Sequence, residues 1–214
     1  MYLSRDAQTR SHTLRGVVAD SKKRVFDIVV ASLVTMSILI WLVPLLALLI
    51  KATSPGPALF VQQRTGRNGR VFPCLKFRTM AYEKDAQFRQ ATRNDLRVTR
   101  IGRFLRKTSL DEMPQFLNVL AGHMSVVGPR PHPIPLDAKH WDTLAGYRER
   151  YTVRPGITGL AQARGARGET EELYKMKIRV RYDRLYIRRQ SSRLDVRICW
   201  WTVKAAVRGS KQVW

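Results

Sequence analysis

Two adjacent carboxylates, Asp111 and Glu112, stand in the most basic part of the sequence and are the side chains best suited to chemistry. They belong to the segment 104–120 and follow Arg106 and Lys107 closely. An ionised carboxylate is a nucleophile for phosphorus and a ligand for metal ions, and neighbouring cations hold it ionised. The pair is therefore a candidate catalytic dyad in a setting whose cations suit a phosphate substrate.

The residues around the dyad predict a helix whose first turn carries the two acids. Thr108 or Ser109 can cap its N-terminus, and Pro114 suits the first turn. Acidic residues in a first turn are also common helix stabilisers, worth about 1 kcal/mol or less through the backbone dipole. The basic context favours an oxyanion site over this structural interpretation, because cations and free backbone N–H groups then share one corner.

Further cations occur in two other segments. Lys76 and Arg78 alternate with apolar neighbours and share one face of a predicted strand, although a solvated strand face explains the same pattern. Arg130 stands in the glycine–proline segment 127–133. The rigid backbone there lowers the entropy that an arginine loses when it binds a phosphate.

The composition points to an anionic partner. The chain has 214 residues and a formal net charge of +23, which suits nucleic acid, anionic lipid or phosphorylated substrates. Its two cysteines, Cys74 and Cys199, stand far apart and match neither a disulfide framework nor a zinc site. The length suits one domain with one core and a membrane element.

An apolar stretch from Val25 to Ile50 is long enough to cross a bilayer. Positive residues mark the cytoplasmic side of a membrane segment, and here they flank both ends, at 22–24 and from Lys51 onwards. Pro44 interrupts the backbone hydrogen bonds and allows the chain to turn back. We therefore expect a re-entrant membrane helix; an ordinary kinked transmembrane helix and a soluble core helix remain open.

The remaining elements predict an α/β fold that is mostly helical. Asn68-Gly69 predicts a hairpin turn between two short strands, and the last helix is basic and carries Trp200 and Trp201, as is typical of a membrane surface. Packing of that helix on the core explains its pattern equally well. Strands are expected at 58–63 and 71–77, and helices at 81–108, 141–151, 169–189 and 193–208.

Three parts are expected along the chain. Residues 1–21 form an N-terminal arm, residues 22–52 form the re-entrant helix with a break near Pro44, and residues 53–214 form a small cytoplasmic catalytic domain. Amphipathic helices of that domain are expected to lie at the membrane interface.

Several motifs, in order, resemble the bacterial sugar transferases, the monotopic polyprenyl-phosphate glycosyl-1-phosphate transferases. The resemblance covers nearly everything after Lys22 and is specific because so many motifs coincide. The matching stretches are KRVFD at 23–27, the segment 54–72, KFRTM at 76–80, the dyad segment 105–120, MSVVGPRP at 124–131, RPGITGLAQ at 154–162 and YDRLYI at 182–187.

This resemblance implies an enzyme that moves a sugar 1-phosphate from a UDP-sugar to undecaprenyl phosphate and releases UMP, the first membrane step of exopolysaccharide or other glycan assembly. By resemblance, Asp111 attacks the sugar-bearing phosphate to form a covalent phospho-sugar aspartate, and Glu112 supports it. Mg²⁺ bound at Asp111 is expected to neutralise the diphosphate. The residues expected to bind substrate phosphate are Arg106, Arg130, Lys76 and Arg78.

The resemblance also implies partners and a location. We expect the cytoplasmic leaflet of the bacterial inner membrane, no nucleic acid, and surfaces compatible with a homodimer. The segment 167–170 resembles the branch that uses UDP-glucose or UDP-galactose. A non-catalytic membrane scaffold and a protein that binds anionic lipid or nucleic acid remain alternatives. The intact dyad argues against a scaffold, and aromatic residues do not interleave with the arginines as in a nucleic-acid groove.

Overall fold

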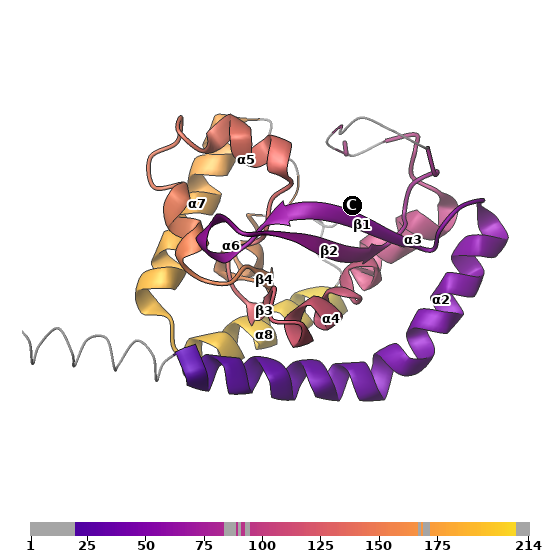
Figure 1. Cartoon of the computed structure of the whole chain (residues 1–214), viewed down its shortest axis with the longest axis horizontal. Coiled ribbons are helices and arrows are strands. Elements are labelled where there is room, and N and C mark those ends of the chain that lie inside the picture. The colour runs from indigo at the N-terminus through magenta and orange to yellow at the C-terminus, as the bar shows by residue number, and fades with distance from the viewer. Residues whose placement is uncertain are drawn as a thin grey trace, which may run out of the picture.

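The structure is a computed structural model, which describes residues 20–83, 89, 91–92, 95–166, 168 and 172–208. Most of this part of the chain is helical, and its strands form two two-stranded sheets (Figure 1). Nearly all of the predicted N-terminal arm, residues 1–21, lies outside the described residues.

A long apolar helix, Asp20–Thr53, borders the molecule along its lower and right-hand sides in Figure 1. Its second half consists of a π-helical segment η1, Thr35–Leu39, followed by α2, Ile40–Thr53, which contains Pro44. Pro44 has no N–H to donate to the preceding turn, and Figure 1 shows the helix bent between its first part and α2. Whether the bend returns the chain to the same side of a membrane stays a prediction.

This helix is suited to lipid by its length, its composition and its exposure. It has 34 residues, and its most apolar window has a mean hydropathy of 2.7 with only 22% of the residues buried. Within the described part of the chain it is the one helix that meets the length and composition needed to cross a membrane. Large apolar side chains such as Met36 and Leu48 are exposed.

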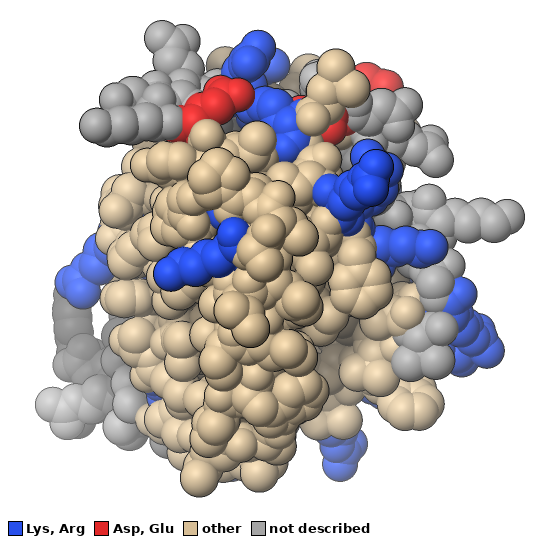
Figure 2. Space-filling view, turned by 90° about the vertical axis from the view of Figure 1, so that its right-hand side faces the viewer, with Lys and Arg blue, Asp and Glu red and all other residues tan. Residues whose placement is uncertain are grey.

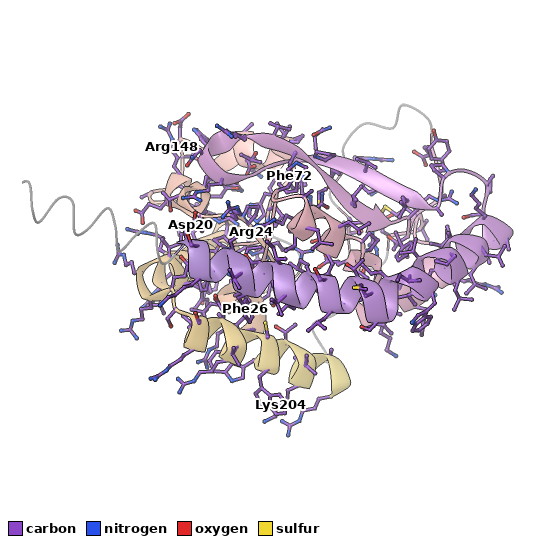
Figure 3. All side chains as sticks on the ribbon, turned by 60° about the horizontal axis from the view of Figure 1, so that its bottom comes forward. Asp20, Arg24, Phe26, Phe72, Arg148 and Lys204 are labelled. Carbon is purple, nitrogen blue, oxygen red and sulfur yellow. The ribbon has the colours of Figure 1, made fainter. Side chains whose placement is uncertain are left out.

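Buried charges join the start of this helix to the rest of the protein. Lys23 Nζ lies 3.0 Å from Asp27 Oδ1 and 3.2 Å from Asp195 Oδ2, on helix α8 (Ser192–Val207). Asp27 Oδ1 also accepts hydrogen bonds of 2.9 Å from the Ser125 hydroxyl and the Val126 N–H. Figure 3 shows the long helix and α8 side by side. Charges that are paired and hydrogen-bonded in this way fix the position of the helix.

A β-hairpin carries one of the predicted cations. Strands β1, Leu59–Thr65, and β2, Val71–Phe77, pair antiparallel, and Asn68 and Gly69 in the turn have φ of 57° and 76°. The predicted strands and turn are confirmed. Asn118 on helix α4, Gln115–Leu120, accepts a hydrogen bond from the Leu75 N–H on β2, so that α4 is fixed against the hairpin.

The second sheet is short and parallel. Strand β3, Ser125–Val127, pairs with β4, Gly156–Thr158, and helix α6, Leu160–Ala163, follows β4 directly. A Cβ atom on Gly156 would lie 2.0 Å from the Gly128 N atom, so this close approach requires glycine. The other helices are the 3₁₀ turns η2, Arg67–Gly69, η3, Leu110–Glu112, and η4, Arg148–Thr152, with α3, Arg100–Thr108, α5, Ile134–His140, and α7, Leu173–Arg189.

Two predicted helices were wrong in extent or position. Of the range 81–108, the described residues are helical only in α3, because Val98 bridges to Met80 and the Thr99 hydroxyl accepts from Gly102 N–H to begin the helix there. The helix expected at 141–151 lies earlier, as α5 after Pro133, and is followed by turns and η4. The helices expected at 169–189 and 193–208 are confirmed by α7 and α8.

Candidate active site

The dyad lies on the 3₁₀ turn η3, between α3 and α4. Ser109 adopts a left-handed conformation with φ of 58° and ends α3, and α4 begins only at Gln115. The prediction of a capped α-helix with both acids in its first turn was therefore wrong. The dyad therefore lies among cationic side chains rather than at a helix N-terminus.

Glu112 holds two of the predicted cations. Its Oε1 accepts a hydrogen bond of 2.7 Å from Lys76 Nζ, and Arg130 donates to both carboxylate oxygens, with 3.0 Å between Nη1 and Oε2. Burial opposes ionisation of this carboxylate, but the charges of Arg130 and Lys76 outweigh it and hold the pKa of Glu112 well below its ordinary range. Glu112 is thus an anion that positions two cations.

Asp111 lies beside this cluster without an ion pair or hydrogen bond of its own carboxylate among the described residues. Only 9% of its surface is exposed. Burial raises its pKa from 3.8 to about 6, against the opposing charges of Lys76, Arg130 and Arg106. At neutral pH the carboxylate is therefore mostly ionised and free to react, which is the state that a nucleophile needs.

The other two predicted phosphate ligands differ in their surroundings. Arg106, at the end of α3, donates from Nε to the Thr79 hydroxyl at 2.9 Å. Its positive charge opposes the rise that burial causes in the pKa of Asp111. Arg78 donates instead to the backbone carbonyls of Pro55 and, at 2.9 Å, Ser54. The structure thus brings Lys76, Arg106 and Arg130 to the dyad and places Arg78 on the turn after α2. Phosphate binding by Arg78 stays a prediction.

A buried polar network that sequence reasoning missed supports the loop of Arg130. Arg150 donates from Nη2 to the Arg130 carbonyl at 2.6 Å and from Nε to Asp183 Oδ2 at 2.7 Å. Arg150 Nη1 also lies 3.0 Å from His132 Nδ1, and burial together with the surrounding arginines holds the pKa of His132 well below its usual value. Asp183 stands in the YDRLYI motif and His132 in the segment 127–133, but no motif contains Arg150, which joins them.

One carboxylate of the site, that of Asp111, is available to a metal ion. Among the described residues no group of three or more His, Cys, Asp or Glu side chains could hold an ion. Glu112 has both oxygens engaged, whereas the Asp111 carboxylate is free. Mg²⁺ is usually bound through one or two carboxylates together with substrate phosphates and water, so that Asp111 alone can serve as its protein ligand.

The motif that suggested the sugar lies almost entirely outside the described residues. Of the segment 167–170, only Gly168 belongs to the described residues, where its carbonyl accepts a hydrogen bond of 3.0 Å from Arg179. The geometry of the dyad therefore supports a type of reaction, and the identity of the hexose is inferred from related proteins.

The chain is similar to known proteins over most of its length, and not only at the site. The family model for "Bacterial sugar transferase" matches residues 18–209. A UDP-glucose:undecaprenyl-phosphate glucose-1-phosphate transferase of Klebsiella pneumoniae is 51% identical over 185 residues, which cover 85% of this chain and 39% of that protein. A protein of the same description from Caulobacter vibrioides is 49% identical over 188 residues, 87% of this chain and 70% of that one.

A shorter relative matches over most of its own length. The exopolysaccharide production protein PSS of Rhizobium leguminosarum bv. phaseoli is 45% identical over 186 residues, which cover 85% of this chain and 92% of that protein. The chain spans only about two fifths of the length of the Klebsiella pneumoniae relative. Because the family model covers almost the whole sequence, the chain belongs to the bacterial sugar transferase family.

Proposed function

We propose that the protein transfers a hexose 1-phosphate, with glucose 1-phosphate as the leading candidate, from a UDP-sugar to undecaprenyl phosphate and releases UMP. The observation that carries this proposal is the division between the two carboxylates: Glu112 is paired with Lys76 and Arg130, whereas the buried Asp111 is unpaired. The Klebsiella pneumoniae and Caulobacter vibrioides relatives, described as UDP-glucose:undecaprenyl-phosphate glucose-1-phosphate transferases, support the donor and the acceptor.

In the first half-reaction an oxygen of Asp111 bonds to the phosphorus that carries the sugar. The bond from that phosphorus to the bridging oxygen breaks, and UMP leaves with the oxygen. Lys76, Arg106 and Arg130 stabilise the negative charge on the phosphate oxygens, because phosphoryl transfer depends mainly on positioning and charge neutralisation. Bound Mg²⁺, held by Asp111 and the diphosphate, would supply further positive charge.

In the second half-reaction a phosphate oxygen of undecaprenyl phosphate bonds to the same phosphorus. The bond to Asp111 breaks, and the carboxylate is regenerated as the lipid-linked diphosphate sugar forms. Two half-reactions suit the substrates, because one is dissolved in water and the other lies in lipid, so each can approach the dyad separately.

The surface of the long helix supports a membrane location. Figure 2, which views the molecule from the side of α2, shows an area of uncharged surface below its centre, with charged side chains above it, at the sides and at the lower edge. We place this helix in the cytoplasmic leaflet as a re-entrant element, with the catalytic part on the cytoplasmic face. Labels introduced at positions 4 and 211 are then expected to react from the cytoplasmic side only, and labelling from opposite sides would establish a full span.

The decisive assay measures UMP release from a panel of UDP-sugars, with Mg²⁺ and undecaprenyl phosphate present. Wild type, Asp111→Asn and the exposed control Asp142→Asn are compared. We expect release from UDP-glucose, a loss of at least about 100-fold in Asp111→Asn, and no change in the control. Near-wild-type turnover in Asp111→Asn would exclude the nucleophile. No release from any UDP-sugar would favour a scaffold or an anion-binding protein.

A second measurement separates covalent catalysis from direct transfer. UDP-glucose labelled with ³²P at the sugar-bearing phosphate is incubated with the protein without undecaprenyl phosphate. The aspartyl intermediate is supported if label stays with the wild-type chain after denaturation and is absent from Asp111→Asn. Undecaprenyl phosphate added before denaturation should then release that label. Turnover without any retained label supports direct transfer.

A further inference from the structure

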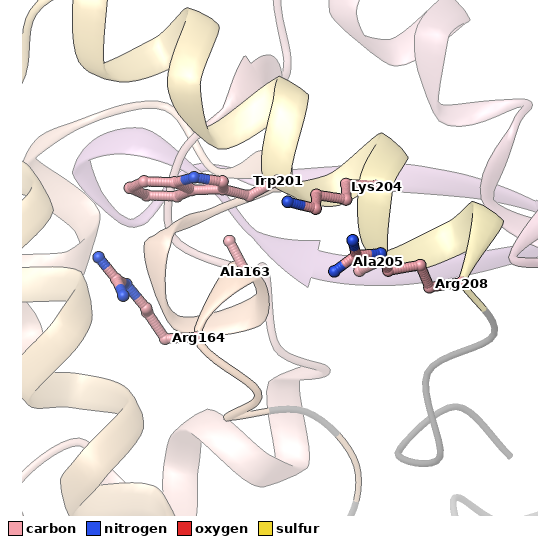
Figure 4. Close-up of a pocket in the computed structure, with 6 residues that line it drawn as sticks. All are labelled: Ala163, Arg164, Trp201, Lys204, Ala205 and Arg208. Atoms are coloured by element: carbon pink, nitrogen blue, oxygen red, sulfur yellow. The ribbon is translucent and has the colours of Figure 1, made fainter.

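A cationic cavity of about 380 Å³ lies between α6 and α8 (Figure 4). It shares none of its lining residues with the dyad cluster, so the proposed transfer reaction does not account for it. The residues that line it are Ala163, Arg164, Trp201, Lys204, Ala205 and Arg208.

Its three cations are available to an anion. The Arg164 guanidinium lies over the Trp201 ring, 4.6 Å from its centroid, which fixes the guanidinium plane and leaves its N–H edge free. Among the described residues, no acidic side chain lines the cavity and none of Arg164, Lys204 and Arg208 has an ion pair. Three uncompensated cations around one cavity favour a phosphate group.

The cavity lies next to an apolar stripe of α8. Val196, Trp200 and Val203 are 56%, 64% and 56% exposed and recur at the spacing of one helical face. Trp201 and Lys204 lie on the adjoining face, toward α6. When an amphipathic helix rests on a bilayer, its apolar stripe lies in the acyl region and the cations beside it lie at the level of the headgroups.

We propose that this cavity binds the phosphate of an anionic phospholipid headgroup in the membrane on which α8 rests. The apolar stripe places it at headgroup depth, and the Trp201 ring and the two alanines provide apolar walls for the glycerol and upper acyl region. Lys204 and Arg208, which are exposed, complete the site from the C-terminal end of α8. The bound lipid would hold α6 and α8 on the membrane without taking part in the chemistry at Asp111.

The test uses the full chain in detergent micelles that contain equal amounts of phosphatidylglycerol and phosphatidylcholine. Native mass spectrometry counts the lipids that each chain retains. We expect wild type to prefer phosphatidylglycerol, and the triple variant Arg164→Gln, Lys204→Gln, Arg208→Gln to lose that preference by at least about tenfold. The control removes the same charge from exposed positions elsewhere, through Arg70→Gln, Lys139→Gln and Arg181→Gln, and is expected to retain the preference.

Other outcomes would overturn the proposal. An equal loss in both triple variants would show that net charge, rather than the cavity, selects the lipid. Retention of phosphatidylglycerol by the cavity variant at the wild-type level would exclude the site. Displacement of the lipid by an excess of inorganic phosphate alone would identify a site for a soluble anion. None of these readouts depends on UMP release, so the transfer reaction and the lipid site fail or succeed separately.

Discussion

The two carboxylates of the dyad are expected to affect stability in opposite directions. Burial raises the pKa of Asp111 to about 6, so its ionised form is disfavoured in the folded protein. Cations hold the pKa of Glu112 well below its ordinary range, so its ionised form is favoured by folding. At pH 7.5 the substitution Asp111→Asn should therefore stabilise the fold while it abolishes transfer, and Glu112→Gln should destabilise it.

The size of the first effect follows from the pKa. A rise from 3.8 to about 6 corresponds to about 3 kcal/mol of destabilisation by the ionised group above pH 6, since one pKa unit equals about 1.4 kcal/mol. Below the folded-state pKa the cost declines, to about 1 kcal/mol at pH 4.5, because the folded protein then binds the proton that the unfolded chain binds weakly. For a chain of this length, 3 kcal/mol is an increase of about 6 to 12 °C in Tm.

The second effect arises from the partners of Glu112. Glu112→Gln leaves Lys76 and Arg130 without their anion in a site where the Glu112 side chain is only 16% exposed, and breaking such a buried pair costs about 3 kcal/mol. Because the pKa of Glu112 is depressed, its contribution is present above its ordinary pKa and is lost only as the pH falls through the lower folded-state value. The penalty should persist at pH 4.5.

The assay is thermal unfolding of wild type and both variants in detergent at pH 7.5 and 4.5. Asp111→Asn should unfold above wild type at pH 7.5, with a smaller difference at pH 4.5, and Glu112→Gln should unfold below wild type at both. The exposed substitution Asp142→Asn serves as the control and should show neither effect. A lower Tm for Asp111→Asn at pH 7.5, or a gain that does not depend on pH, would refute the assignment of the raised pKa to this residue.

Three further predictions concern the reaction and the elements that support it. UMP release should rise with pH through about 6 and be about tenfold slower at pH 5 than at its plateau; a flat profile contradicts an Asp111 nucleophile. Gly102→Ala should lower stability by about 3 kcal/mol, measured by thermal unfolding, because its Cβ would lie 1.9 Å from the Thr79 carbonyl oxygen; an unchanged Tm contradicts this contact. Arg150→Lys should lower kcat about tenfold with little change in KM, because lysine lacks the fork that holds the Arg130 carbonyl; an equal change in both contradicts a positioning role.

Local patterns in the sequence were sufficient for several elements. Alternating apolar residues around Asn68-Gly69 predicted the hairpin, since only a few residues tolerate the positive φ that its turn requires. Amphipathic spacing predicted α7 and α8, and the length of the apolar run predicted the helix Asp20–Thr53. In each case the information lies within one stretch of chain.

Contacts between distant segments could not be predicted in this way. The 3₁₀ turn at the dyad depends on the left-handed Ser109, and the late start of α3, at Arg100, follows the bridge between Met80 and Val98. The contact of Lys76 with Glu112 joins residues 36 positions apart, and the family resemblance, rather than spacing, suggested that they act together. The support of Arg130 by Arg150 had no local signal at all, because a buried arginine and a solvated one look alike in sequence.

The geometry of η3 explains how neighbouring residues acquire different roles. In a 3₁₀ helix successive side chains point about 120° apart, so the Asp111 and Glu112 side chains leave the turn in different directions. Glu112 takes Lys76 and Arg130, and Asp111 is left buried near their charge without a hydrogen bond from them. On an α-helix the same two residues would diverge by about 100°, but α4 would then begin at the dyad, and its free N–H groups would pair with Asp111 and lower its reactivity. The tighter turn therefore keeps one carboxylate engaged and the other available.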